Sequence, residues 1–343
     1  MSKMFFVTLV SVLLFGCRDK VKKSTDIQMF NSIGMKGQPE YMCFLNPNEG
    51  YSFNYITESE EQTEEQLNDP NFLPKKNTVS TIYRTLDGGI NWVKVYSIND
   101  YAFYRTAYLN ESAVYIKIIN YNETLKNKLL KFDLKSLKGS VLDFNFERMG
   151  EIWSVNQKVF VNSKNNNINK IYSTDQNFKK IDSLQIDKVF KDKITLLNNK
   201  PYVLTWNNEI YNIESNGTFK ISNTYDLESM ASKEIGCLLV ADKVDSFITL
   251  HSYDIISQQV KKLEEFRGYN IVQGLRSNHR VIYGFIGNVS GSFTKYDLFY
   301  SLDRGKTWQV QELMEKNYIH PSYLVDNVLY IYSGKHRFQK IVF

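Results

Sequence analysis

The most constraining feature of this chain is a short turn motif that occurs twice. Residues 85–92 read Thr-Leu-Asp-Gly-Gly-Ile-Asn-Trp, and residues 301–308 read Ser-Leu-Asp-Arg-Gly-Lys-Thr-Trp. Both have a hydroxyl residue, then Asp two positions later, Gly two positions after that, and Trp three positions further on. The two aspartates, Asp87 and Asp303, are 216 residues apart, which equals five steps of about 43 residues.

Weaker copies of this turn lie between the two strong ones. Ser173 and Asp175 keep the hydroxyl and the carboxylate, and Asn177 stands where glycine is expected. Asn also tolerates the positive φ that such a turn requires. Further turn centres near residues 133, 215 and 254 complete a series of six with spacings from 39 to 49 residues. A repeat of about 40–45 residues is one four-stranded blade, so the period predicts an all-β propeller with seven blades, or alternatively six.

On these residues the chain resembles the Asp-box (BNR-type) sialidase-like β-propellers. The resemblance implies that each motif closes the hairpin between the last two strands of a blade, on the face opposite the usual ligand site. The hydroxyl and the carboxylate would bond to the turn backbone, the glycine would adopt positive φ, and the Trp would pack between blades. It therefore implies a structural role for Thr85, Asp87, Gly89, Trp92, Ser301, Asp303, Gly305, Trp308, Ser173 and Asp175.

Short runs rich in Val, Ile, Tyr and Phe predict the strands of each blade. We expect the first blade at residues 41–45, 50–53, 81–84 and 92–95, and the ends of five further blades near residues 143, 183, 222, 266 and 312. Three strands follow, at 323–325, 328–332 and 338–343. A fourth strand from residues 27–33 would close the ring and cover both sheet edges. No sustained helical periodicity is found after the N-terminal segment.

The N-terminal sequence has the pattern that predicts an export signal. Lys3 precedes an apolar run from Met4 to Phe15, which is too short for a membrane span of about 20 residues. The sequence Leu-Phe-Gly-Cys at 14–17 resembles the signal of bacterial lipoproteins, with a plain signal peptide as the alternative. The resemblance implies that residues 1–16 are removed and that Cys17 is lipidated. Residues 17–26 then form a tether, and residues 27–343 a single propeller domain.

The net charge excludes nucleic acid as a partner, and the charge of the tether indicates where in the cell the protein lies. Without Lys3 the chain has 41 basic and 37 acidic residues, a net charge of +4. This is too small for a nucleic-acid-binding surface, for which domain pI exceeds about 9. In many lipoproteins of this kind an acidic stretch after the cysteine marks export to the cell surface. Here the tether is basic, which favours a lipid-anchored protein of the bacterial envelope on the periplasmic face of the outer membrane.

No catalytic or metal-binding pattern was found. Sialidases carry an arginine triad and an Arg-Ile-Pro element, whereas Arg84 here lies in a predicted strand and no such element precedes Asp87. Acids near predicted turns, Asp242 among them, are interpreted as solvated. No cofactor is predicted. No metal is predicted either, because the histidines lack metal-ligand spacing; these are His251, His279, His320 and His336. Enzymatic activity stays uncertain, and a non-catalytic role is favoured.

One insertion in the predicted first blade is strongly acidic. Between residues 58 and 69 it has six acids and no basic residue: Glu58, Glu60, Glu61, Glu64, Glu65 and Asp69. Such a segment is either a solvated loop or an electrostatic contact for a basic partner. Aromatic side chains open a different alternative, because they stack on sugar rings. The candidates are Trp206, Tyr269, Tyr283 and Tyr296.

The two cysteines outside the anchor, Cys43 and Cys237, are predicted as buried free thiols, with a disulfide as the alternative. Taken together, the sequence favours a lipid-anchored envelope propeller that binds a protein partner in a scaffold, assembly or immunity-type role. The alternative is a glycan-binding protein, or a glycosidase with an unrecognised site.

Overall fold

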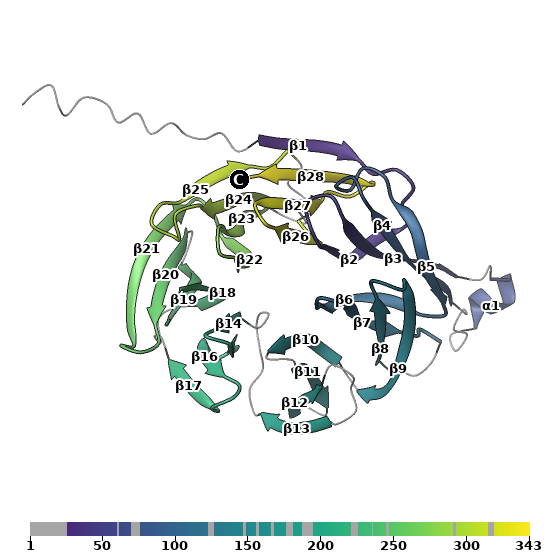
Figure 1. Ribbon diagram of the computed structural model, residues 1–343, viewed down its shortest axis with the longest axis horizontal. Coiled ribbons are helices and arrows are strands. Elements are labelled where there is room, and N and C mark those ends of the chain that lie inside the picture. Colours follow the sequence, from purple (N-terminus) through teal and green to yellow (C-terminus); the bar gives the residue numbers. More distant parts are fainter. Residues whose placement is uncertain are drawn as a thin grey trace, which may run out of the picture.

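The computed structural model describes residues 26–59, 62–69, 76–122, 127–146, 149–155, 158–165, 168–175, 181–186, 195–220, 226–234, 236–244, 247–290, 293–314 and 319–343. Cys17 and the predicted signal and tether lie outside these residues, apart from Asp26. The described residues form seven four-stranded antiparallel sheets arranged in a ring (Figure 1). The prediction of an all-β propeller is confirmed, with seven blades and not six.

The first four blades follow one another along the chain. Blade 1 consists of β2 (Gln38–Phe44), β3 (Gly50–Ser59), β4 (Lys76–Thr85) and β5 (Val93–Asn99). Blade 2 consists of β6 (Ala102–Leu109), β7 (Ala113–Ile119), β8 (Asn127–Asp133) and β9 (Lys138–Phe146). Blade 3 consists of β10 (Met149–Val155), β11 (Lys158–Asn165), β12 (Ile168–Asp175) and β13 (Ile181–Ile186). Blade 4 consists of β14 (Thr195–Leu197), β15 (Lys200–Leu204), β16 (Glu209–Asn212) and β17 (Gly217–Lys220).

Three further blades complete the ring. Blade 5 consists of β18 (Asp226–Glu234), β19 (Cys237–Val244), β20 (Phe247–Asp254) and β21 (Gln259–Arg267). Blade 6 consists of β22 (Ile271–Ser277), β23 (Ile282–Ser290), β24 (Phe293–Ser301) and β25 (Gln309–Glu312). Blade 7 consists of β26 (Ser322–Val325), β27 (Val328–Tyr332), β28 (Arg337–Val342) and β1 (Asp26–Asn31). In every blade but the seventh, the strand nearest the ring centre comes first in sequence (Figure 1).

The ring is closed by its two chain ends, as the sequence predicts. Strand β1 pairs antiparallel with β28, from Asp26 opposite Val342 to Asn31 opposite Arg337. The chain then crosses to blade 1, where the Ile33 amide donates to the Ile90 carbonyl at 2.8 Å. Because β1 covers the outer edge of the last sheet, blade 7 gains a fourth strand and is tied to blade 1.

Burial explains why the strands differ in sequence pattern. Neighbouring blades cover both faces of the second strand of a blade. Strands β7 and β27 are accordingly buried along their whole length. The outermost strands β17 and β25 face solvent on one side and alternate between half-buried and exposed side chains. The continuous apolar runs therefore mark the inner strands of the blades, and the alternating runs mark the rim.

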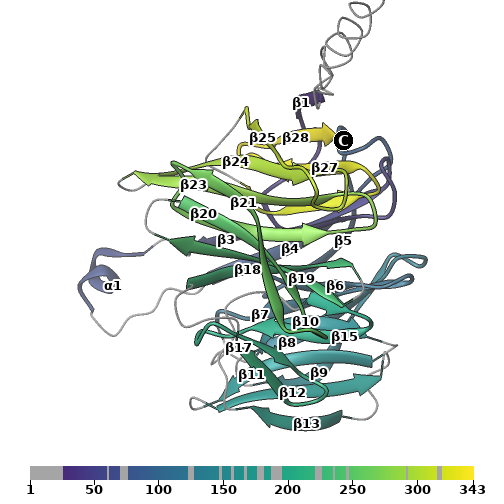
Figure 2. The same ribbon diagram turned by 90° about the vertical axis from the view of Figure 1, so that its left-hand side faces the viewer.

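The connections between strands emerge at two ends of the blades. Because the strands are antiparallel, the turns after the first and third strands lie at one end, and the connection between the second and third strands lies at the other. All six predicted turn centres lie at the last residue of the third strand of their blades or just after it. The acidic insertion joins β3 to β4 and so lies at the opposite end. It contains helix α1 (Glu64–Asn68), which projects from the ring (Figure 2).

Candidate functional site

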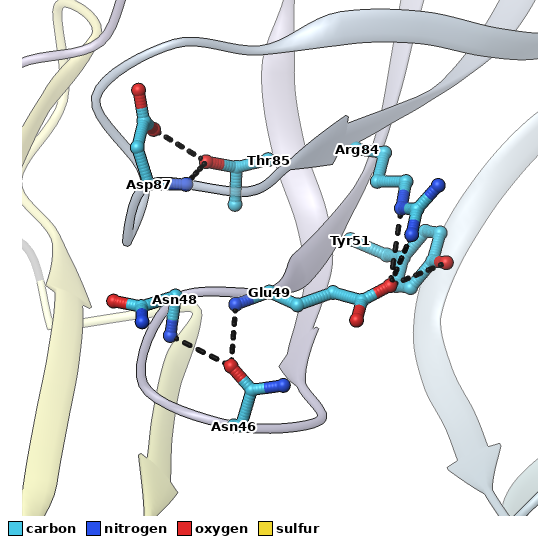
Figure 3. Close-up of polar contacts among 7 residues, drawn as sticks. All are labelled: Asn46, Asn48, Glu49, Tyr51, Arg84, Thr85 and Asp87. Atoms are coloured by element: carbon cyan, nitrogen blue, oxygen red, sulfur yellow. Dashed lines mark hydrogen bonds and ion pairs between the residues drawn. The ribbon is translucent and has the colours of Figure 1, made fainter.

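The turn after β4 is held by its own side chains (Figure 3). The Thr85 hydroxyl donates to Asp87 Oδ1 at 2.9 Å and accepts from the Gly89 amide at 3.0 Å. Asp87 Oδ1 also accepts from the Asn91 amide at 2.9 Å. The Trp92 indole donates to the Gly89 carbonyl at 2.7 Å, and its ring lies 6.0 Å from that of Phe338 in blade 7. These residues therefore stabilise the turn and the contact between two blades.

The turn after β24 repeats this arrangement. Ser301 donates to Asp303 Oδ1 at 2.8 Å, and the Gly305 amide donates to the Ser301 hydroxyl at 2.7 Å. Burial would raise the pKa of Asp303, but hydrogen bonds from the Thr307 hydroxyl and amide and from Ser301 outweigh it and leave the pKa below the ordinary value. The balance for Asp87 is the same. Trp308 packs against the cluster between blades 5 and 6.

The structure describes some of the weaker copies of the turn motif completely and one only at its start. Ser173 and Asp175 lie at the end of β12, and the turn that follows them is outside the described residues. Asp133 accepts from the Ser136 amide at 2.7 Å, and Asp254 accepts from the Ile256 amide at 2.8 Å. In both, hydrogen bonds from the turn hold the carboxyl pKa below its ordinary value.

Arg84 lies in β4, as expected, and is engaged in an ion pair within blade 1 (Figure 3). Its Nη2 and Nε lie 2.7 Å and 3.1 Å from Glu49 Oε1, and the Tyr51 hydroxyl donates to the same oxygen at 3.3 Å. Glu49 belongs to the turn after β2, which Asn46 closes by accepting from the Glu49 amide. This group therefore joins two neighbouring turns at one end of blade 1.

The acidic insertion differs from expectation in one respect. Thr63 and Gln66 form a capping box at the start of α1: the Gln66 amide donates to the Thr63 hydroxyl at 3.3 Å, and the Thr63 amide donates to Gln66 Oε1 at 3.0 Å. This helix of five residues was not predicted, although the absence of sustained helical periodicity agrees with so short an element. The signal was present in Thr63-x-x-Gln66, but one turn of helix is too short to show periodicity.

The acids of the insertion are solvent-facing wherever they are described. Glu58 lies near the end of β3, Glu64 is the first residue of α1, and Asp69 follows its last residue; all three are exposed. Glu65 lies within α1, and Glu60 and Glu61 lie outside the described residues. The structure therefore brings Glu58, Glu64 and Asp69 to one end of blade 1.

A second group of polar residues lies at the same end, between blades 1 and 2, and sequence reasoning missed it. Arg105 of β6 places Nε 3.4 Å from the Glu40 carboxylate of β2. Burial is the first cause that raises the pKa of Tyr55 in β3 to about 12, and the neighbouring Tyr121 side chain raises it further. Both Glu40 and Arg105 also act electrostatically on Tyr55. We call Glu40, Tyr55, Arg105 and Tyr121 the Tyr–Arg cluster.

Irregular pairing of the innermost strands creates this cluster. The register shifts in β2 between Pro39 and Tyr41, and in β6 between Phe103 and Ala107. A bulge re-aims side chains that regular alternation would bury, and Arg105 is consequently 75 % exposed at its side chain. Single-sequence patterns do not reveal bulges, so no sequence signal could have placed Arg105 against Glu40.

The aromatic candidates divide into exposed and buried. Trp206 is 62 % exposed in the connection between β15 and β16. Tyr283 and Tyr296 are buried in blade 6, and Tyr269 donates its hydroxyl to Asp297 at 3.0 Å. The stacking role is therefore wrong for Tyr283 and Tyr296, because the propeller core uses their rings.

The structure corrects two further expectations, which concern the burial of Asp242 and of Cys237. Asp242 of β19 is fully buried and faces His251 of β20, so the interpretation of Asp242 as a solvated turn residue is wrong. Both described cysteines are free; Cys43 is buried, as expected, but Cys237 is only half-buried, and the Ser252 hydroxyl lies 3.8 Å from its sulfur. Burial raises the pKa of the Cys43 thiol well above its ordinary value.

The described residues form neither a metal-binding group nor a membrane-spanning helix. There, no three His, Cys, Asp or Glu side chains come together in a way that could hold a metal ion. No helix in the same ranges is long and apolar enough to cross a bilayer.

Comparison with known proteins identifies the fold alone. No protein-family model and no curated protein sequence matches the chain. Among solved structures, it resembles the oligogalacturonate lyase of Vibrio parahaemolyticus, with a TM-score of 0.55 and 9% identity over 93% of this chain and 96% of that one. It also resembles the β-propeller domain of the Trilobed protease from Pyrococcus furiosus (TM-score 0.53, 9% identity, 87% and 90% covered).

A third similar structure is the acylaminoacyl peptidase of Pyrococcus horikoshii, with a TM-score of 0.53 and 11% identity over 90% of this chain and 51% of that one. The Pyrococcus furiosus propeller is described as having an open velcro topology, whereas here β1 pairs with β28 within one blade. At these identities the likeness shows a β-propeller scaffold.

Proposed function

We propose that this chain is a lipid-anchored β-propeller of the bacterial envelope that binds a protein partner, in a scaffold, assembly or immunity-type role. The observation that carries the proposal is the acidic insertion, which stands at the end of blade 1 opposite the turns. Surface acids at a protruding helix raise the rate at which a basic partner is met. A rigid ring that presents such a segment supports docking, although a propeller scaffold alone does not specify a function.

The proposed cellular location rests on the sequence of residues 1–17. The lipoprotein-type signal supports lipidation of Cys17, and the basic tether supports a position on the periplasmic face of the outer membrane. An anchor with more than one acyl chain attaches stably, whereas a single chain is marginal. Globomycin, which blocks lipoprotein signal cleavage, should cause a precursor to accumulate, and Cys17→Ser should release the protein from membranes. A Cys17→Ser chain that stays membrane-bound would contradict the anchor.

We also propose that the two recurring turns are Asp-boxes of the sialidase-like type. The matched hydrogen bonds at Thr85–Asp87 and Ser301–Asp303 support this assignment, as does their place between the third and fourth strands of blades 1 and 6. On this proposal the turns are structural, and the partner meets the other end of the blades.

The test of partner binding is crosslinking in intact cells followed by affinity capture of the protein. The informative variant neutralises the insertion by replacing its six acids with Gln or Asn, keeping its length and the Thr63–Gln66 cap. Deleting residues 58–69 would also remove Glu58 and Ser59, which pair with Asn77 and Lys76. We expect one reproducible protein partner, weaker capture by the neutralised variant, and an unchanged Tm. Equal capture would refute the role of the insertion.

One observation favours a second candidate, glycan binding. Trp206 is 62 % exposed in a connection at the same end of the blades as the insertion, and an exposed ring can stack on sugar faces. A carbohydrate-array screen of wild type and Trp206→Ala would decide this. Binding that disappears in the variant would favour the glycan role over the protein partner.

A further inference from the structure

We propose that the described acids of the insertion (Glu58, Glu64 and Asp69) and the Tyr–Arg cluster form one docking surface. This surface receives a protein segment that presents a carboxylate to Arg105 and basic side chains to the three acids. This inference rests on the proposed function, because it specifies where the protein partner binds and what chemistry that partner carries.

The two groups are joined through Lys76. Ser59 and Lys76 pair at the ends of β3 and β4, so they form the base of the insertion. The Lys76 amide donates to Asn122 Oδ1 at 3.1 Å, and Asn122 Nδ2 donates to the Lys76 carbonyl at 2.8 Å. The Lys76 ammonium lies 5.0 Å from the centre of the Tyr121 ring. The base of the insertion therefore touches the Tyr–Arg cluster across the boundary between blades 1 and 2.

The exposed members of the cluster are residue types that dominate protein interfaces. Tyr121 is 40 % exposed, and Tyr104, which adjoins Arg105 in the β6 bulge, is 45 % exposed. Tyr and Arg are enriched among the interface residues whose truncation costs the most binding energy. Three such side chains, Tyr104, Arg105 and Tyr121, come from β6 and from the connection after β7 in blade 2, beside the charged segment of blade 1.

The contact of Arg105 with Glu40 leaves most of the guanidinium group exposed to solvent, where a partner carboxylate can bind. The contact uses Nε at 3.4 Å, and the side chain remains largely solvated. Guanidinium groups bind carboxylates through two parallel N–H groups, and the terminal nitrogens of Arg105 can offer this geometry. Glu40 holds the guanidinium in place while a second carboxylate binds at its outer edge.

The signs of charge then specify the partner. Exposed acids at Glu58, Glu64 and Asp69 attract basic residues, whereas Arg105 and Lys76 attract an acid. A segment that places basic residues beside the three acids and an acidic residue beside Arg105 matches both groups. A uniformly basic or uniformly acidic segment is repelled by one of the two groups. The partner therefore carries an acidic residue flanked by lysines or arginines.

The first experiment is site-specific photo-crosslinking in intact cells. A photoreactive amino acid replaces Tyr121 in one strain and Ile256 in another; Ile256 is 84 % exposed in the turn after β20, at the other end of the blades. We expect an adduct from position 121 only, mapped to a partner segment with the stated charge order. The same partner captured only from position 256 would overturn the docking surface and leave the proposed function intact. No adduct from either position would overturn both.

The second experiment reverses the charge of Arg105 in the purified complex. Arg267 is the matched control, because it is 86 % exposed and paired with Glu265 at 2.7 Å on its own strand. We expect Arg105→Glu to raise the Kd at least about tenfold, as a hot-spot residue would, and Arg267→Glu to leave it unchanged. Replacing the crosslinked partner acid with Lys should restore binding to Arg105→Glu. Equal Kd values for the two variants would contradict the inference.

Discussion

The Asp242 carboxylate lies 3.2 Å from Nε2 of His251, and both side chains are almost completely removed from solvent. Asp242 stands opposite Thr249 in the β19–β20 ladder, and His251 stands two residues further along β20. The two side chains are thus diagonal neighbours on one face of blade 5, the face that packs toward blade 4.

Removing one member of this pair should be costly. We expect Asp242→Ala to lower the free energy of unfolding by about 3 kcal/mol, because a buried polar group loses its partner. The double variant Asp242→Leu/His251→Leu should recover part of this loss, since no buried polar side chain then remains at this place. Urea unfolding followed by fluorescence measures both. If the loss of the double variant equalled the sum of the two single losses, the contact between Asp242 and His251 would not be the cause.

The carboxylate at the centre of the turn after β24 should make stability depend on acid pH. The pKa of Asp303 is held below its ordinary value of 3.8, so its contribution is fully present above about pH 4 and is lost as the pH falls through the folded-state pKa. Asp303→Asn keeps an acceptor oxygen but loses the charge. We expect it to cost about 1 kcal/mol at pH 6, with the difference from wild type shrinking toward pH 2 in urea titrations. A difference that grows with acid would contradict this assignment.

The two tryptophans of the recurring turns should respond differently to the same substitution. Trp92 donates its indole N–H to the Gly89 carbonyl, whereas the buried Trp308 Nε1 finds no acceptor among the described residues. We therefore expect Trp92→Phe to cost about 1–2 kcal/mol because a carbonyl is left unpaired. Trp308→Phe should stay within about 0.5 kcal/mol of wild type. Thermal unfolding of the two variants compares them directly, and equal losses would refute the role of the hydrogen bond.

The junction between the closing strand and blade 1 should tolerate no side chain at Gly34. Gly34 has φ of +85°, and an added Cβ would lie 2.4 Å from the Trp92 carbonyl oxygen. Gly268 is the matched control, because it has φ of +81° but nothing within 4 Å of the added atom. Gly268→Ala should cost about 1–2 kcal/mol from backbone strain alone. Gly34→Ala should cost distinctly more in calorimetry, and a similar cost at both sites would show that the junction adjusts.

Sequence reasoning recovered those parts of the fold that depend on local patterns. The separation of Asp87 and Asp303 predicted the blade length because each blade is an independent four-stranded hairpin series of similar size. The strand around Ile27 was predicted to close the ring because the last three strands would otherwise leave an open edge. Helix α1 was missed because its stability comes from the single cap at Thr63, and periodicity detects only longer helices.

The candidate site was predicted only in part, for a reason of geometry. The acids of the insertion are consecutive in the chain, so their clustering is visible in the sequence. Arg105 and Glu40 are 65 positions apart and meet because two bulges on neighbouring inner strands turn their side chains toward one boundary.

The sequence by itself determined the length of the blades, the closing strand and the turns whose side chains bond to their own backbone, because all of these arise from short-range hydrogen bonding and repeated apolar patterns. Only the tertiary structure decided that the blades number seven, that Asp242 is buried against His251, that Tyr283 and Tyr296 belong to the core, and that Arg105 stands beside Glu40. These contacts depend on strand register and on the packing of one blade against the next, which bring together residues whose spacing in the chain carries no signal.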